Sequence, residues 1–183
     1  MTVDFDYIGK PSEGLTRVKT GIHPKYKCGF INSSNEIVIP LIYSNVRNFS
    51  EGLAAVRCGN WASDKWGFIN KSGTLVIPCI YSKVRNFHNG MSKGIYNGEW
   101  YFINSQGERI FCLKGYDGSS KFNNGFAQVW NRNPDDYNDL TIITVDTLGN
   151  IIVPKEEIKE EPRNEAVEKF LEYLMDKLNN KST

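Results

Sequence analysis

The chain repeats itself at an interval of 38 residues, and this repetition constrains its fold more than any other feature. The segment that begins at Tyr43 (YSNVRNFSEG) returns, with few changes, from Tyr81 (YSKVRNFHNG). A unit of this length cannot bury its own apolar face, so neighbouring copies have to stack into a continuous core. Four copies align through one glycine in each: Gly14, Gly52, Gly90 and Gly125.

Each of these glycines precedes a run with the pattern of a β-strand. In three copies, small or β-branched residues lie two positions apart, which is the period of a strand with one buried face. The predicted strands cover residues 15–19, 53–57, 91–95 and 126–130. The predicted inward positions are Thr16, Val18, Ala54, Val56, Ala127 and Val129.

A turn follows at one position in every copy. The four segments are NSSN from Asn32, NKSG from Asn70, NSQG from Asn104 and DTLG from Asp146. An Asn or Asp in the first place can accept a hydrogen bond from the backbone two residues on. The fourth place suits a left-handed backbone, which Gly and Asn tolerate best. Because apolar runs flank each turn, we expect four β-hairpins.

Prolines close three of the copies, and Cys112 takes their place in the third. Proline has no N–H to donate to a neighbouring strand, so it is expected to end the second strand of the hairpin. The prolines concerned are Pro40, Pro78 and Pro154. These patterns together predict an all-β domain over residues 1–154, an array of about four antiparallel hairpin repeats. An open twisted array is the first expectation, and a closed, propeller-like arrangement is the alternative.

After Pro154 the composition changes. Residues 155–183 hold six basic and eight acidic residues, a net charge of −2. An acidic linker is followed by apolar residues at helical spacing, which predicts an amphipathic α-helix. A short helix needs its apolar face covered, so it either caps the last repeat or docks into a partner, with a homodimer as one form of docking. The apolar positions are Val167, Phe170, Leu171, Leu174, Met175 and Leu178.

Charge and cysteine content narrow the class of protein. The formal net charge is +1, which argues against a nucleic acid as the partner. There is no apolar run of the roughly 20 residues that a membrane span needs and no secretory leader, so a cytoplasmic protein is expected. The four cysteines form no CxxC pair, and free thiols rather than disulfides are predicted.

The second copy carries a family resemblance. It reads FSEGLAAVR over residues 49–57, KWGFINKSG over residues 65–73 and VIP over residues 76–78. With these motifs the chain resembles the WG-repeat family of bacterial proteins. The Trp-Gly position of Trp66 and Gly67 reads Cys-Gly, Trp-Tyr and Ile-Ile in the other three copies. The resemblance implies an all-β array without a defined reaction, and a role as an inhibitor, immunity or accessory protein in a bacterial or phage conflict system.

No catalytic residue, metal ligand or cofactor is predicted. The two histidines lie in different repeats, and no phosphate-binding glycine loop or nucleophile elbow occurs. The predicted function is therefore recognition of another protein. A carbohydrate-binding module is the first alternative, because exposed tryptophans stack on sugars. A hydrolase with spatially assembled acidic residues is the second.

Three regions are candidates for partner binding. The repeated Arg47 and Arg85 would form a short basic row if the copies stack in register. The alternative is that their stems only cover neighbouring aromatics. The second region is the acidic insertion of the fourth copy over residues 131–139, and the third is the apolar stripe of the tail. The candidates at the insertion are Trp130, Asp135, Asp136 and Tyr137, and those in the tail are Phe170 and Leu174. Trp66 and Trp100 share one repeated position and are predicted to be core residues, so that Trp66→Ala would cost about 3–5 kcal/mol.

Overall fold

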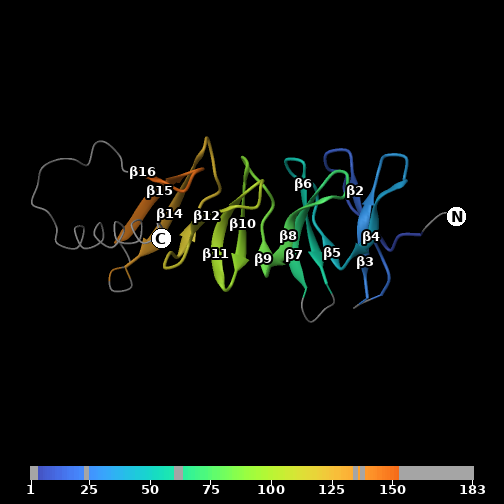
Figure 1. The fold of residues 1–183 in the computed structure, drawn as a ribbon, viewed down its shortest axis with the longest axis horizontal. Coiled ribbons are helices and arrows are strands. Elements are labelled where there is room, and N and C mark those ends of the chain that lie inside the picture. The colour runs from blue at the N-terminus through green and yellow to red at the C-terminus, as the bar shows by residue number, and fades with distance from the viewer. Residues whose placement is uncertain (1–3, 23–24, 60–63, 134–135, 137–138, 153–183) are drawn as a thin grey trace, which may run out of the picture. The chain divides into compact units, whose positions relative to one another are not determined.

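A computed structural model of the chain describes residues 4–22, 25–59, 64–133, 136 and 139–152. These residues form sixteen β-strands in four separate sheets, and each sheet contains four strands that follow one another in the sequence (Figure 1). The sheets succeed one another in chain order as an open array, so the all-β prediction is confirmed and closure into a ring is not observed. The described residues include no helix that is long and apolar enough to cross a membrane. The helix predicted in residues 155–183 lies outside them.

All four sheets are antiparallel meanders with a short first strand. The first sheet contains β1 (Tyr7–Ile8), β2 (Thr16–Thr20), β3 (Lys27–Ile31) and β4 (Ile37–Tyr43). The second contains β5 (Asn45–Val46), β6 (Leu53–Cys58), β7 (Lys65–Asn70) and β8 (Leu75–Tyr81). The third contains β9 (Lys83–Val84), β10 (Met91–Tyr96), β11 (Glu99–Asn104) and β12 (Arg109–Cys112). The fourth contains β13 (Gly118–Ser119), β14 (Phe126–Arg132), β15 (Leu140–Asp146) and β16 (Ile151–Ile152).

The four predicted hairpin turns are confirmed. In the second sheet, the side-chain oxygen of Asn70 accepts hydrogen bonds from the backbone N–H groups of Ser72 and Thr74, at 3.1 and 2.9 Å. Gly73 has a φ of 84° there, the left-handed conformation that glycine adopts without a steric penalty. The same pair of bonds is made by Asn32, Asn104 and Asp146 in the other turns.

The core lies between successive sheets and is built around repeated phenylalanine pairs. In the second, third and fourth copies, a Phe three positions before the aligned glycine packs on the Phe of the preceding sheet's third strand. Phe49 lies 4.8 Å from Phe30 between ring centroids, and Phe87 lies 4.9 Å from Phe68. The third such pair joins Phe102 and Phe122 at 4.8 Å. The predicted inward residues of the second strands are all buried as well: Thr16, Val18, Ala54, Val56, Ala127 and Val129.

A bulge in the fourth strand explains the glycine of the Trp-Gly motif. In the first sheet, Phe30 pairs with Ile39 and Cys28 with Tyr43, so β4 has two more residues than β3 between these pairs. The bulged segment crosses directly over Gly29, where an added Cβ would lie 2.4 Å from the carbonyl oxygen of Ile39. Gly67 has the same relation to β8, with 2.4 Å to the carbonyl oxygen of Ile77.

The expectation that the prolines end their strands is wrong for Pro40 and Pro78, and Pro154 lies outside the described residues. Pro40 lies inside β4 and Pro78 inside β8, both within the bulge. A bulged residue is unpaired, so the missing N–H of proline leaves no hydrogen bond unmade. The third sheet shows the converse, because Tyr101 replaces the glycine and pairs directly with Cys112 without this bulge. In the first three sheets, glycine and the proline bulge therefore occur together and are absent together.

The connector between the first and second strands of each sheet contains a two-residue turn closed by an isolated bridge, and these turns are linked from sheet to sheet. Glu13 and Gly14 both have positive φ values, 52° and 87°. The carboxylate of Glu13 accepts hydrogen bonds from the N–H groups of Glu51 and Gly52 in the next turn, at 2.6 and 3.0 Å. The carboxylate of Glu51 binds the turn after it in the same way, at Asn89 and Gly90. We call these two contacts the turn clamps.

The clamp at Glu13 predicts a loss of stability in acid. Partial desolvation raises the pKa of Glu13, but hydrogen bonds from Gly52, Lys71 and Glu51 outweigh it and hold the pKa below its usual value of 4.5. A carboxyl group whose pKa is lowered by folding stabilises the protein at higher pH, and this contribution is lost as the pH falls through the folded-state pKa. Glu13→Gln should therefore weaken the fall of the urea midpoint as the pH goes from about 7 to about 3.5. Glu99→Gln, whose side chain forms no clamp, is the control. Equal pH profiles for Glu13→Gln and the unmodified chain would contradict the assignment.

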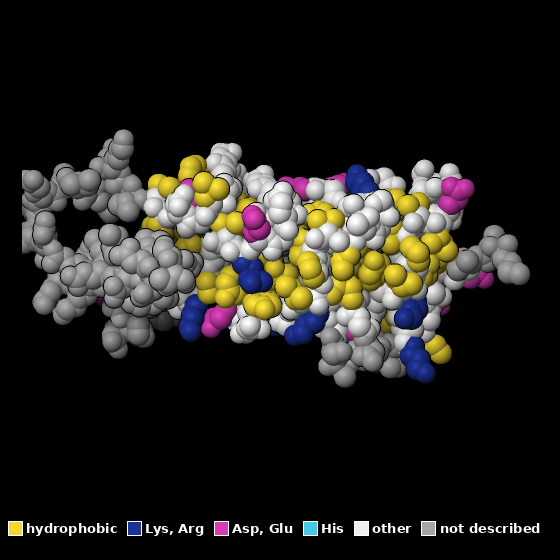
Figure 2. All heavy atoms as spheres, in the orientation of Figure 1, with side chains coloured by type: hydrophobic (Ala, Val, Ile, Leu, Met, Phe, Trp, Pro, Cys, Tyr) yellow, Lys and Arg dark blue, Asp and Glu magenta, His cyan; other side chains and the backbone are white. Residues whose placement is uncertain are grey.

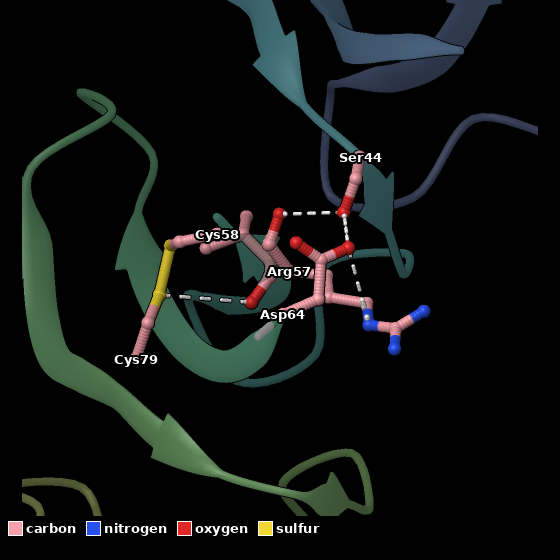
Figure 3. The surroundings of a disulfide bond; sticks show 6 residues. Ser44, Arg57, Cys58, Asp64 and Cys79 are labelled. Carbon is pink, nitrogen blue, oxygen red and sulfur yellow. Dashed lines mark hydrogen bonds and ion pairs between the residues drawn. A yellow bond between two sulfur atoms is a disulfide. The ribbon is translucent and has the colours of Figure 1, made fainter. Parts of the chain in front are cut away.

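Cys58 and Cys79 form a disulfide, so the prediction that all cysteines are free thiols is wrong for these two (Figure 3). Their Cα atoms lie 6.0 Å apart, although β7 runs between β6 and β8 in the sheet. The bulge carries β8 over Gly67, where an added Cβ would lie 2.8 Å from the backbone nitrogen of Cys79, and so brings the two cysteines together. Cys28 and Cys112 remain free thiols.

Candidate binding surface

Arg47 and Arg85 occupy equivalent positions in the second and third sheets, one residue after β5 and one residue after β9. The guanidinium carbon of Arg47 lies 5.2 Å from the ring centre of Trp66, and that of Arg85 lies 6.0 Å from the ring centre of Trp100. Each arginine is thus held by a cation–π contact with the tryptophan of its own sheet. We call these four residues the arginine row.

The two arginines are close enough to influence each other. Burial lowers the pKa of Arg47, and the positive charge of Arg85 lowers it further. Within the part of the chain that the structure describes, neither guanidinium forms an ion pair with a carboxylate. The predicted basic row is therefore present, and its charge is not balanced by a neighbouring acid.

The tryptophans of the row are not core residues, which corrects the prediction for Trp66 and Trp100. Both side chains are only partly buried, whereas Phe68, two residues after Trp66, is 1% exposed. Trp66 and Phe68 have the spacing of one strand face, but Trp66 lies near the start of β7, with Arg47 over its ring. Its ring packs against the edge of the core and also supports a charged side chain.

An aspartate beside the disulfide is fixed by its neighbours rather than free to bind. The Asp64 side chain is fully buried, and its Oδ2 accepts a hydrogen bond of 2.6 Å from the Ser44 hydroxyl (Figure 3). The same oxygen lies 3.6 Å from Nε of Arg57. This group joins the start of the second sheet to its central strands and is structural.

Of the other predicted contact residues, the structure describes Trp130 and Asp136, and both belong to the fourth repeat. Trp130 is half-buried on β14 and packs on Gly118, where an added Cβ would lie 2.6 Å from its ring. Asp136 is exposed in the loop between β14 and β15, and its carbonyl accepts the N–H of Asp139 at 3.0 Å. The remaining candidates lie outside the described residues: Asp135, Tyr137, Phe170 and Leu174.

Sequence reasoning missed an exposed apolar strip on the outer strands of the first two sheets. Figure 2 shows hydrophobic side chains gathered in a band along the row of sheets. On β4 the exposed side chains include Ile42, which is 60% exposed, and on β8 the equivalent residue is Ile80. We call the following residues the edge strip: Ile37, Val38, Ile42, Leu75, Val76 and Ile80. The signal in the sequence was the apolar run after each turn, which is longer than one buried strand face requires.

The described residues contain no candidate metal site, because no three of their His, Cys, Asp or Glu side chains are grouped closely enough to hold an ion.

Comparison with known proteins gives one match. The family model for the WG containing repeat matches residues 29–60 and 66–100, the segments that hold both glycine-and-bulge arrangements. No curated protein and no solved structure matches the chain. The two consecutive matches agree with the Trp-Gly motif, the internal repetition and the repeated sheets described above. Two consecutive repeats of this chain therefore match the WG containing repeat.

Proposed function

We propose that this chain is a non-catalytic protein-binding module whose arginine row contacts an acidic surface on its partner. The observation that carries the proposal is the repetition of an arginine, stacked on a tryptophan and without a paired acid, in two successive sheets. Arginine presents several N–H donors in a fixed plane that matches a carboxylate, and Arg and Trp are enriched among residues that dominate binding energy.

Preorganisation supports this use of the row. A free arginine side chain loses rotamer entropy when it binds, but a guanidinium already stacked on an indole has lost part of it beforehand. The guanidinium plane then keeps its donors for the partner. Complementary charge would speed association as well as select the partner.

The edge strip favours a protein rather than a small molecule as the ligand. Contiguous exposed apolar side chains on soluble domains typically mark protein contact surfaces. Here they recur on β4 and β8 at equivalent positions, so a partner that follows the array meets the same side chains twice.

The test is capture of proteins from a lysate of the native host by three forms of the full chain. These are the unmodified chain, Arg47→Glu with Arg85→Glu, and a control with Lys65→Glu and Lys83→Glu, two exposed lysines of the same sheets. We expect a protein that the unmodified chain and the control retain, and that the arginine variant retains at least about tenfold less. Its retention should also fall as salt is added. Identical sets of retained proteins for all three forms would contradict the proposal.

A further inference from the structure

A pocket of 610 Å³ opens where the third sheet meets β13 and the segment between β13 and β14. Among the described residues, no Asp or Glu lines it. Its floor is formed by the buried rings of Phe87, Phe102 and Phe122. The side chains that give it its polar character are Arg85, Asn86, His88, Lys93, Ser119 and Lys121.

The pocket is a place where the repeat departs from its own pattern. Ala55 pairs with Phe68 in the second sheet, and Lys93 takes the same position opposite Phe102 in the third. Val84 is the buried residue of β9, the first strand of the third sheet, and Ser119 takes the equivalent position in β13 of the fourth. An apolar pair at one interface is thus replaced by a lysine and a serine at the next.

Lys93 is held in this position by its own contacts. Its ammonium group donates to the carbonyl and hydroxyl oxygens of Ser119, at 3.1 and 2.9 Å, and lies 3.4 Å from the carbonyl of Ser120. Desolvation lowers the pKa of Lys93, and the positive charges of Arg85 and Lys121 lower it further. None of these three cations forms an ion pair with a carboxylate among the described residues.

Donors remain free at the mouth of the pocket. Ser50 and Ser92 use their hydroxyl protons on the carbonyls of Phe87 and Arg85, at 2.8 Å each. By contrast, in the described part of the chain the side chains of four other lining residues form no hydrogen bond within the protein. These residues are Arg85, Asn86, His88 and Lys121.

From this arrangement we infer that the pocket binds a phosphate monoester, with Arg85 and Lys121 contacting the phosphate and Lys93 supplying charge behind it. Three uncompensated cations favour an anion with more than one negative charge, and a phosphate offers acceptors in several directions to the convergent donors. The volume lies in the range of ligand pockets and exceeds what one phosphate fills, which leaves room for the group that carries it. The site shares Arg85 with the proposed partner surface, but Lys93 and Lys121 belong to the pocket alone and Arg47 to the partner surface alone.

The experiment is titration of the full chain with phenyl phosphate and with inorganic phosphate. Calorimetry measures the binding, and thermal unfolding measures the change in Tm. Sodium acetate at equal ionic strength is the comparison. We expect saturable binding of both phosphates and a rise in Tm that acetate does not produce. Arg85→Gln and Lys121→Gln should each lower the affinity by about tenfold or more, the loss expected for one charge-assisted hydrogen bond. Lys114→Gln, which removes an exposed charge outside the pocket, should leave it unchanged.

A second arm identifies the source of the phosphate. A phosphoserine peptide is compared with its unphosphorylated form and with phenyl phosphate. Tighter binding of the phosphopeptide would assign the phosphate to a protein, and equal binding would assign it to a small molecule; both support the site. Equal effects of phosphate and acetate, or unchanged phosphate affinity in Lys121→Gln, would overturn it. Arg47→Glu, which should impair partner capture but not phosphate binding, keeps the two proposals distinguishable.

Discussion

Replacing Gly29 with alanine is expected to destabilise the chain by about 3 kcal/mol, although the change adds a single methyl group. The new Cβ would lie 2.4 Å from the carbonyl oxygen of Ile39 and 2.7 Å from that of Pro40. Both contacts are with backbone, which cannot move aside as a flexible side chain does. The β4 bulge would have to lift from β3, and the hydrogen bonds around it would be strained. Urea unfolding at neutral pH measures the effect.

Two comparisons make this prediction specific. Lys27→Ala, an exposed change at the start of the same strand, should alter stability by less than about 0.5 kcal/mol. Deleting Pro40 and Leu41 should remove the bulge and give the regular pairing that Tyr101 and Cys112 show in the third sheet. In that background, Gly29→Ala should cost less than about 1 kcal/mol, because coupled changes are not additive. A cost below about 1 kcal/mol in the unmodified background would show that the bulge does not rest on this glycine.

The glycine also shows how far the sequence determines the fold in advance. The hairpin turns could be predicted because their signal is local: an Asn or Asp bonds the backbone two residues on, as Asn70 does with Ser72. The second strands could be predicted because burial of one face leaves a period of two. The bulge could not, because it depends on contact between Gly29 and a strand ten residues later, and a proline in that strand suggests an end rather than a crossing.

The same distinction between local and long-range contacts explains why the sequence did not predict the disulfide or the pocket but did predict the arginine row. Cys58 and Cys79 lie on strands that are not neighbours in the sheet, and only the bulge brings them together. The arginine row was found because the repeat itself places Arg47 and Arg85 in register. The pocket was missed because its members come from several connectors, and because Lys93 matters through the absence of acids around it, which no linear pattern shows.

The second large effect is expected for Phe68→Ala, at about 3–5 kcal/mol. Phe68 is 1% exposed and packs edge-on against Phe87, with 4.9 Å between ring centroids. The pair lies between the second and third sheets, and in a repeat array the stability of the whole depends on such interfaces between neighbours. Truncation would leave a cavity that two sheets border, and neither can close it without shifting against the other. Thermal and urea unfolding of the full chain measure the loss.

Trp66→Ala is the matched comparison, because Trp66 lies on the same strand as Phe68 and has the larger side chain. Its side chain is only partly buried and carries Arg47 on its face, so its removal should cost about 1–2 kcal/mol, less than the removal of Phe68. Combining Phe68→Ala with Phe87→Ala should cost less than the sum of the two, since both remove one shared contact. If Trp66→Ala proved the more damaging change, the tryptophan that marks the repeat would be its core after all. The expected order instead assigns stability to the phenylalanine pairs between sheets and leaves the tryptophans available to hold the arginine row for a partner.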